Sequence, residues 1–406
     1  MSEPDTYTRW AVLASGEGGG RIASSLFGRT DNPGIDDRIL VMNTNRTDLV
    51  NTIERSTLNT VDAEEFRADY SQDFGSLDGV GNYFPAGEQC ARMDRKRITN
   101  TVTQQGLGDA NAFLHVTTLG GGTGNGSVPY LIHSMKSDPP DPSMEGIVHV
   151  ALAAWPYDFE GGQRHFNAVC GLSRLLRWYD GSQNADMVVL ISNSHVSEDG
   201  DLNESGEAKY ESVNRNAIRA MDMMIGAGRE TRSVVDVSDL ITWPSRLDAY
   251  HFTPAIAMGQ PTFFELELLF EKAADNAFVP MDKTTSKVVY AVVRAPKHLV
   301  QNGEYTEAGL EEALQSWLDK QGMDEVVHQM PTLTPVSRRS DTVDVLLLFG
   351  GFDLNPLLEN SRPKFEQIMA EATRDGLATD IETPGEEFTA EQFRTIEQNL
   401  SEYLEG

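Results

Sequence analysis

The chain has 406 residues and carries 62 Asp and Glu against 33 Lys and Arg, which gives a formal net charge of −29 at pH 7. This charge disfavours direct binding to nucleic acid or to an anionic lipid surface, because both are negatively charged. The length predicts two domains with extensions, and the 39% hydrophobic content is enough to build folded cores, which excludes global disorder.

The residue usage also indicates a compartment. An acidic chain low in lysine is typical of a protein from a high-salt cytoplasm, where counter-ions screen its self-repulsion. The two cysteines, Cys90 and Cys170, have no metal-ligand spacing around them, so neither a disulfide framework nor a zinc site is expected. The first residues lack the features of a secretory signal, and no apolar run is long enough to span a membrane. We therefore expect a soluble, cytoplasmic and halophilic protein without direct membrane insertion.

The first predicted element is a strand over Trp10 to Ala14, followed by a glycine-rich turn, Ser15 to Arg21, and the apolar face of a helix. This order is typical of nucleotide binding, because backbone N–H groups at a helix N-terminus attract phosphate. A dinucleotide fold is disfavoured, since its third glycine would fall on Arg21 and the next strand ends in amides rather than a carboxylate.

The second predicted strand, Arg38 to Met42, ends in the polar run Asn43 to Leu49. Asn and Thr at a strand end are most often turn formers, but after a glycine loop they are better interpreted as the edge of a site. Residues 52 to 75 are polar with little periodicity, which predicts a loop and a short helix. The segment Gly79 to Gly87 alone predicts a loop and indicates no function. Met93 to Gly106 has helical character.

The central feature is the run Leu119 to Ser127, which follows a predicted buried strand over Ala112 to Val116. Its glycines let the backbone approach a ligand and converge several N–H groups on one anion, with Thr123 and Ser127 as further donors. A flexible linker is the alternative, but the apolar segments on both sides disfavour it. No Lys-Ser or Lys-Thr follows the last glycine, so this is not a Walker loop, and charge neutralisation must come from backbone and metal.

A further predicted strand, Ile147 to Ala154, is apolar on both faces, as in a covered parallel sheet. It ends in the segment Trp155 to Arg164. Taken alone, Glu160 and Arg164 would be an exposed i, i+4 ion pair at a helix N-terminus.

Amide and aromatic side chains follow the next elements. After an amphipathic helix over His165 to Tyr179, a strand over Met187 to Ile191 leads to Asn193. Tyr210 and Asn214 lie on one face of a predicted helix, where the ring can stack on a purine while the amide reads its edge. Guanine suits a pair formed by Asn193 and Asn214 better than adenine does. Asn is ordinary at helix starts, so the pair alone is a weak signal.

The rest of the chain predicts an α+β domain and a helical end. Asp236 and Asp239 are consistent with a helix N-cap and its capping partner. Apolar residues recur at helical spacing from Phe388 to Leu404. This pattern predicts a helix packed on the rest of the protein, with docking of a partner protein as the alternative. The other elements are predicted as helices over 263–277, 306–321 and 356–373, and as strands over 287–294 and 343–349.

Six of these segments resemble loops of the tubulin/FtsZ superfamily, and they follow one another along the chain in the order that the superfamily has. The central run resembles Gly-Gly-Gly-Thr-Gly followed by a small residue and Gly, with Asn125 at the small position. The first loop resembles Gly-Gln-x-Gly-Gly-Lys/Arg-Ile, with Glu17 in place of Gln. The second resembles Asn-Thr-Asp-x-x-x-Leu, with Asn45 in place of Asp, and the third resembles Gly-x-Gly-Asn.

The two remaining segments are similar to the family's ribose loop and synergy loop. Trp155 to Arg164 resembles Pro-Phe-x-Phe-Glu-Gly-x-x-Arg. Ser233 to Leu240 resembles Asn-x-Asp-Phe-Ala-Asp-Val, with Val234 in place of Asn. The resemblance covers residues 10 to 260 well and is nearer to archaeal CetZ and noncanonical FtsZ-like proteins than to a division-ring FtsZ.

The resemblance implies an α/β fold with a parallel-sheet, Rossmann-like GTPase domain, a central core helix and a smaller α+β second domain. The implied domains are an N-terminal tail over 1–9, a GTP-binding domain over 10–207, a core helix over 208–229, a second domain with the synergy loop over 230–352 and an acidic helical extension over 353–406.

The resemblance also implies a site for GTP or GDP with Mg²⁺. Glu160 would take the ribose hydroxyls, and Arg164 would reach ribose and phosphates. Glu17 would either help to hold the metal or repel the phosphates, in which case Arg21 would offset its charge. Asp236 and Asp239 would be the catalytic residues. The implied nucleotide-binding residues are Gly16, Glu17, Gly18, Gly19, Gly20, Arg21, Asn43, Gly81, Asn82, Gly120, Gly121, Gly122, Thr123, Gly124, Asn125, Gly126, Glu160, Arg164, Asn193, Tyr210 and Asn214.

The implied function is that of a GTP-hydrolysing cytoskeletal protein with a role in cell shape or division. Its partner would be itself, in a head-to-tail contact that generates open filaments. The alternative is a non-polymerising GTP-binding scaffold or regulatory paralogue, motivated by Val234, Asn125 and Glu17.

Overall fold

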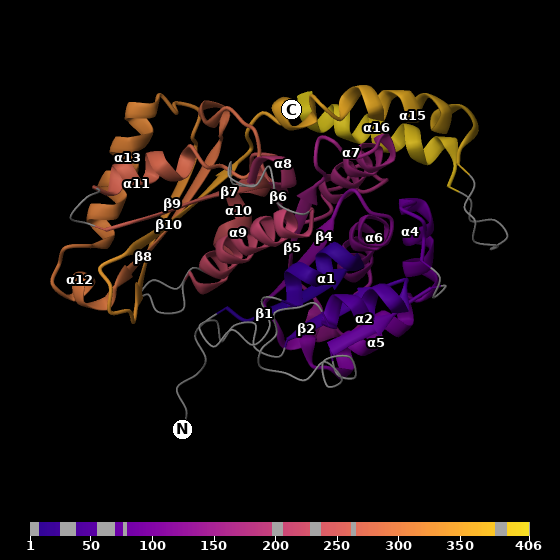
Figure 1. The fold of residues 1–406 in the computed structure, drawn as a ribbon, viewed down its shortest axis with the longest axis horizontal. Coiled ribbons are helices and arrows are strands. Elements are labelled where there is room, and N and C mark those ends of the chain that lie inside the picture. The colour runs from indigo at the N-terminus through magenta and orange to yellow at the C-terminus, as the bar shows by residue number, and fades with distance from the viewer. Residues whose placement is uncertain are drawn as a thin grey trace. The chain divides into compact units, whose positions relative to one another are not determined.

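The computed structural model describes residues 8–24, 38–54, 70–75, 79–196, 206–227, 237–260, 265–377 and 388–405. The chain forms two compact units (Figure 1). The larger unit consists of residues 9–188, 192–194 and 357–406, and the smaller unit of residues 1–8, 189–191 and 195–356. The C-terminal helices therefore cluster with the N-terminal half of the chain.

A parallel sheet forms the centre of the larger unit. Five of its strands have the order β3-β2-β1-β4-β5, and every pair among them is parallel. Their side chains are buried except in β3, because a parallel sheet is covered on both faces. The bounds are β1 (Trp10–Ser15), β2 (Ile39–Asn43), β3 (Ser71–Asp73), β4 (Ala112–Thr118) and β5 (Val148–Trp155). The residues of β6 (Met187–Ser192) are divided between the two units.

Crossover helices return the chain between these strands, since parallel neighbours cannot be joined by tight hairpins. The helices are α1 (Gly16–Ser24), α2 (Arg46–Glu54), α4 (Phe84–Met93), α5 (Arg95–Gln104), α6 (Thr123–Ser137) and α7 (Gly162–Leu176). Single 3₁₀ turns occupy Leu107–Asp109 and Pro142–Met144. The carboxyl ends of β1, β2, β4 and β5 therefore open onto loops at one edge of the sheet, which is where α/β folds bind ligands.

The last two helices pack against α7 within the larger unit. These are α15 (Arg362–Asp375) and α16 (Ala390–Glu405). The hydroxyl of Ser173 on α7 donates to the carbonyl of Ile396 on α16 at 2.7 Å, and the ring of Phe393 packs edge-to-face on Phe84 and at a tilt on Phe166. The apolar stripe predicted near the end of the chain is thus a helix packed on the body.

The smaller unit holds a mixed sheet with strand order β7-β10-β8-β9. β10 is antiparallel to both β7 and β8, whereas β8 and β9 are parallel. The strands are β7 (His251–Gly259), β8 (Val288–Pro296), β9 (His328–Val336) and β10 (Val343–Gly350). The helices are α8 (Asn193–Val196), α9 (Gly206–Gly226), α10 (Val237–Arg246), α11 (Leu266–Ala274), α12 (Lys297–Gln301), α13 (Glu307–Gln321) and α14 (Asn355–Leu358), and a 3₁₀ turn covers Lys283–Thr285. Of these, α8 begins in the larger unit and α14 ends in it.

These two units confirm the predicted fold class, an α/β body with a smaller α+β part. In the described part of the chain, every helix is too short or too polar to cross a lipid bilayer.

Candidate nucleotide site

The first glycine loop and the central glycine run touch through their backbones. Gly16 has a φ of +79°, and a Cβ atom there would lie 3.1 Å from the backbone nitrogen of Gly124. A Cβ atom at Gly124 would collide in turn with the carbonyl oxygen of Ser15. Only glycine allows this approach, so the two loops form one continuous backbone surface between β1 and β4.

The glycines of the central run differ in what surrounds them. A Cβ atom at Gly122 would collide with the backbone of Tyr83, and one at Gly126 with the carbonyl oxygen of Phe84. A Cβ atom at Gly121, by contrast, would meet only the hydroxyl of Thr118, at 3.8 Å. Close packing therefore accounts for Gly122 and Gly126, whereas a side chain at Gly121 would meet no clash.

The N–H groups of this run are available to an anion. Those of Gly120, Gly121 and Gly122 donate no hydrogen bond to any residue that the structure describes. They precede α6, a helix of 15 residues whose N-terminus carries the positive end of the helix dipole. Unpaired N–H groups beside a helix N-terminus are the chemistry of a phosphate cradle.

Hydroxyl groups tie the neighbouring loops to the run. The hydroxyls of Ser15 and Ser127 lie 2.7 Å apart, and those of Thr44 and Thr123 lie 2.6 Å apart. The hydroxyl of Ser127 also donates to the carbonyl of Thr123 at 2.7 Å. The loop after β2 is thereby joined to the glycine run, as its interpretation as a site edge requires.

Asn43 and Asn45 shape the loop after β2. The side-chain oxygen of Asn43 accepts the N–H of Asn45 at 3.1 Å. That of Asn45 accepts the N–H groups of Thr47 and Asp48 at the start of α2. Both side chains therefore form turns. Asn43 is 3% exposed, and its contact with a nucleotide stays a prediction.

Two carboxylates and a guanidinium face one another beside the first loop. Glu17 and Arg21 form an ion pair of 2.5 Å. Burial raises the pKa of Asp48, the charge of Glu17 raises it further, and Arg21 lowers it. Within the described ranges, His, Cys, Asp and Glu side chains form no cluster of three or more that could hold a metal ion. One carboxylate fits Mg²⁺ only together with phosphate oxygens, which is how Mg²⁺ binds at nucleotide sites.

The third loop closes over the run from the other side. Gly79, Gly81 and Asn82 all have positive φ angles, and Asn82 is an uncommon case because it carries a side chain. The turn is closed by the N–H of Tyr83, which donates to the carbonyl of Val80 at 2.9 Å. The exposed Asn82 lies at the tip of this loop, where the resemblance predicts a phosphate contact.

Glu160 and Arg164 form the i, i+4 pair that the sequence allows, with 3.1 Å between Arg164 Nη1 and Glu160 Oε1. The other carboxylate oxygen of Glu160 accepts the N–H of Tyr157 at 2.8 Å. Arg164 packs against Gly120, because a Cβ atom there would lie 3.3 Å from Arg164 Cβ. Its side chain is 43% exposed, so the guanidinium stays beside the run and accessible to a ligand.

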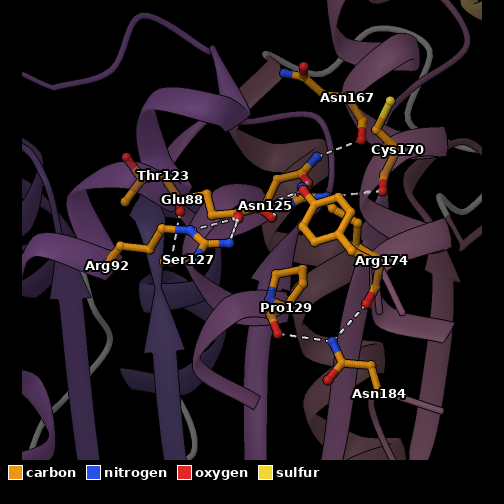
Figure 2. A network of polar contacts seen from close by, with 11 residues as sticks. Glu88, Arg92, Thr123, Asn125, Ser127, Pro129, Asn167, Cys170, Arg174 and Asn184 are labelled. Carbon is orange, nitrogen blue, oxygen red and sulfur yellow. Dashed lines mark hydrogen bonds and ion pairs between the residues drawn. The ribbon is translucent and has the colours of Figure 1, made fainter. Parts of the chain in front are cut away.

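A buried polar network lies behind the glycine run (Figure 2). Asn125 is fully buried, and its amide nitrogen donates to the carbonyls of Leu119 and Asn167. Its amide oxygen accepts Arg174 Nη2 at 2.6 Å. The side chain of Asn125, which was predicted as a ligand contact, is therefore occupied by protein partners, and its predicted nucleotide contact would have to come from its backbone.

Arg174 and Glu88 form the charged centre of this network, 2.8 Å apart, with side chains 1% and 2% exposed. Glu88 also pairs with Arg92 at 2.5 Å and accepts the hydroxyl of Tyr179 at 3.1 Å. Burial raises the pKa of Tyr179 well above its usual range, and the charge of Glu88 adds to this shift. Sequence reasoning missed these residues, because no local pattern links positions 88 and 174.

The remaining predicted residues are distributed over both units. Asn193, which is 6% exposed, begins α8 in the larger unit, whereas the half-buried Asn214 lies on α9 of the smaller unit. Tyr210 lies on α9, but its side chain is outside the described residues, as is all of Asp236. Asp239 is exposed in the first turn of α10. That these residues meet at one nucleotide stays a prediction.

Comparison with known proteins finds a family match. Residues 10–200 match the family described as Tubulin/FtsZ family, GTPase domain. These residues, slightly less than half of the chain, are similar to a tubulin/FtsZ-family GTPase domain. CetZ1 of Haloferax volcanii is 25% identical over 239 residues, which are 57% of this chain and 55% of that protein. FtsZ of Neisseria gonorrhoeae is 28% identical over 169 residues, 42% of this chain and 35% of that protein. The CetZ match thus spans about half the length of the relative.

Solved structures of tubulin/FtsZ-family proteins share the fold. CetZ1 from Haloferax volcanii, solved as a GDP-bound monomer, has a TM-score of 0.71 at 20% identity and covers 89% of this chain and 99% of its own. CetZ2 from the same organism, solved as a GTPγS-bound protofilament, has a TM-score of 0.67 at 18% identity, with coverage of 88% and 99%. These likenesses extend the shared fold beyond residue 200.

Proposed function

We propose that this protein binds GTP with Mg²⁺, hydrolyses it, and assembles head to tail into cytoskeletal filaments. The observation that carries the proposal is the joined pair of glycine loops. The N–H groups of Gly120, Gly121 and Gly122, which precede the α6 N-terminus, have no acceptor in the described part of the chain. The relatives support it, since one CetZ structure holds GDP and another is a GTPγS-bound protofilament.

The larger unit would hold the phosphates and the ribose. The glycine run and the α1 and α6 N-termini would bind the phosphate oxygens, and Glu160 and Arg164 would bind the ribose and phosphates. Mg²⁺ would be held by the phosphates and by Glu17, and it would neutralise charge that develops on the phosphoryl group. Arg21, paired with Glu17, reduces the repulsion between this carboxylate and the phosphates.

The base would be read by amides. Asn193 and Asn214 can each pair with the edge of guanine, and Tyr210 would stack on the ring. A site built to pair with guanine rejects adenine because an unmatched buried polar group costs about 1–3 kcal/mol. Equal affinities for GTP and ATP, or an unchanged preference in Asn214→Ala, would contradict this assignment.

Hydrolysis would be completed in trans. Asp239 is exposed in the first turn of α10, so its carboxylate is accessible to a neighbouring molecule. Asp236 or Asp239 would orient or polarise the attacking water at the nucleotide of the next subunit. Positioning and general-base effects of this kind contribute roughly 10²–10⁴-fold in rate.

A head-to-tail contact is heterologous, so it extends into open filaments rather than closing. The role in cell shape or division, the cytoplasmic and halophilic setting, and a protein partner at α16 belong to this proposal. The buried residues of α16 include Phe393, Ile396 and Leu400, so its apolar stripe is used within the larger unit, and a partner would bind the polar face.

A non-polymerising GTP-binding scaffold is the second candidate, motivated by Val234, Asn125 and Glu17. Sedimentation in molar KCl with GTP, GDP or ATP separates the two. We expect pelleting with GTP alone. GTP binding without pelleting at any protein concentration would favour the scaffold, and absence of guanine-nucleotide binding would exclude both candidates.

A further inference from the structure

Asn167, on α7, contacts both loops that border the cradle. Its side chain is fully buried, and Nδ2 lies 2.6 Å from the carbonyl oxygen of Asn82 in the third loop. The same nitrogen lies 3.1 Å and 3.3 Å from the carbonyl oxygens of Gly120 and Gly121. The two N–H groups of one amide therefore reach three carbonyls of two loops that are separated by about forty residues of sequence, so at least one N–H is shared between two carbonyls.

The orientation of this amide is fixed by its other contacts. Its oxygen accepts the side-chain amide of Gln163 at 3.0 Å, and the backbone carbonyl of Asn167 accepts Asn125 Nδ2 at 2.6 Å. Asn125 is held by Arg174, which is paired with Glu88. Gln163 therefore fixes which atom of the Asn167 amide faces the carbonyls, and the network behind the run holds the Asn167 backbone through Asn125 (Figure 2).

The contacts with Gly120 and Gly121 determine where the next two N–H groups point. In a trans peptide the C=O and the following N–H lie in one plane and point in opposite directions. Since the carbonyls of Gly120 and Gly121 turn toward Asn167, the N–H groups of Gly121 and Gly122 turn away from it. Those two N–H groups have no acceptor among the described residues.

We propose that Asn167 is a positioning residue that aims the Gly121 and Gly122 N–H groups at the nucleotide phosphates and holds the third loop against them. This inference rests on the proposed function. It predicts that loss of the Asn167 donors weakens nucleotide binding by more than any loss of stability explains. Without these donors, the Gly120 and Gly121 carbonyls would no longer be held, and the two peptides would lose their orientation.

Asn184 provides a matched control in the same network. It is 1% exposed, and its Nδ2 donates to the carbonyls of Pro129 on α6 and Arg174 on α7, at 2.9 and 2.7 Å. Asn167→Asp and Asn184→Asp make the same chemical change at two buried amides. Only the first removes donors from the Gly120 and Gly121 carbonyls.

The test measures GDP affinity by titration and stability by denaturant unfolding, in molar KCl, for the wild type and both variants. We expect Asn167→Asp to weaken GDP binding about tenfold or more, and Asn184→Asp to change it less than about twofold at a comparable loss of stability. The Asn167→Asp affinity should fall further as pH rises, since the introduced carboxyl donates a hydrogen bond only while protonated. Equal GDP affinities of wild type and Asn167→Asp, or equal losses in both variants, would overturn the inference.

Hydrogen exchange on the wild type tests the same geometry without a variant. It is the deciding experiment in the case that Asn167→Asp does not fold. We expect GDP to slow exchange at the Gly121 and Gly122 N–H groups, and unchanged exchange would overturn the inference. A wild type that binds no GDP would overturn the proposed function and this inference together. A wild type that binds GDP, with an unaffected Asn167→Asp, would overturn this inference alone.

Discussion

At the scale of single residues, the Glu88–Arg174 pair is the most consequential contact behind the site. Both side chains are almost fully excluded from solvent. Removal of Arg174 would leave Glu88 with Arg92, whose side chain is 40% exposed, as its charged partner, and the buried oxygens of Asn125 would lose a donor. Arg174 also bonds both oxygens of Asn125, so this pair supports the glycine run from behind.

Arg174→Met should therefore lower the free energy of unfolding by about 1–3 kcal/mol, the usual cost of buried polar groups that lose a hydrogen-bond partner. Arg177→Met is the control, because Arg177 pairs at 3.5 Å with Glu402, whose side chain is 49% exposed, and such pairs contribute about 0–1 kcal/mol. Denaturant unfolding of the larger unit measures both. Equal losses in the two variants would show that burial of the pair does not determine its contribution.

His115 and His149 predict a pH dependence. Their rings stack, with 2.9 Å between Nε2 of His115 and Nδ1 of His149. Burial lowers the pKa of His115 to about 3, and burial together with the charge of His115 lowers that of His149 well below its usual value. The unfolded chain takes up these protons near pH 6.5, before the folded protein does, so the stabilisation is complete above pH 6.5 and is lost as pH falls toward about 3.

His115→Gln should consequently reduce the loss of stability between pH 6.5 and pH 4. The exposed His195 supplies the control, and His195→Gln should keep the slope of the wild type. Free energies of unfolding measured across this range compare the slopes. A His115→Gln slope as steep as that of the wild type would contradict the assignment.

At the scale of elements, glycine determines how α4 and α6 pack. A Cβ atom at Gly126 would collide with the carbonyl of Phe84 and the N–H of Glu88, which are backbone atoms that cannot move aside. A Cβ atom at Gly162, the first residue of α7, would meet only Lys364 Cβ at 3.9 Å.

Gly126→Ala should lower the free energy of unfolding by at least about 1–3 kcal/mol, as overpacking does. Gly162→Ala should be neutral or stabilising by up to about 1 kcal/mol, since alanine favours the helix. Thermal and denaturant unfolding test the pair. A folded Gly126→Ala of wild-type stability would mean that the two helices can separate without cost.

The strands of the larger unit other than β3 were predictable because each is a short apolar run that ends in glycine or polar residues. β3 was missed, because it is short and polar and lies in the stretch predicted as a loop and a short helix. β1, β4 and β5 were predicted within two residues of their observed ends. β9 was missed, since Pro331 and Pro335 interrupt its pattern, and it lies at the edge of its sheet, where missing N–H groups are tolerated.

The candidate site divides in the same way. The glycine loops and the Glu160–Arg164 pair were visible, because their signals are local in sequence. Asn167, Glu88 and Arg174 were not, because their roles arise only when α4, α6 and α7 pack together. Lys364 is a further case, since it reaches the carbonyls of Asp158 and Glu160 from α15, about two hundred residues away.

At the scale of the whole molecule, a net charge of −29 sets the response to salt. Like charges repel within one molecule and between molecules until counter-ions screen them, and the Debye length falls from about 10 Å at 0.1 M to about 3 Å at 1 M. Stability and assembly should therefore both increase from 0.1 M to molar KCl. Unfolding and sedimentation across this series measure the two, and a protein equally folded and assembled at low salt would contradict the halophilic interpretation.

The central claim is that hydrolysis needs two subunits, and the dependence of GTPase activity on protein concentration tests it most directly. Specific activity should rise with concentration in molar KCl, and Asp239→Ala should bind GTP nearly normally, turn over roughly 10²–10⁴-fold more slowly and form longer-lived filaments. Mixing Asp239→Ala with a variant in the glycine run should restore some activity, because one mixed contact joins an intact loop to an intact nucleotide site. Specific activity that stays flat over a wide dilution series, or full turnover by Asp239→Ala, would contradict catalysis in trans.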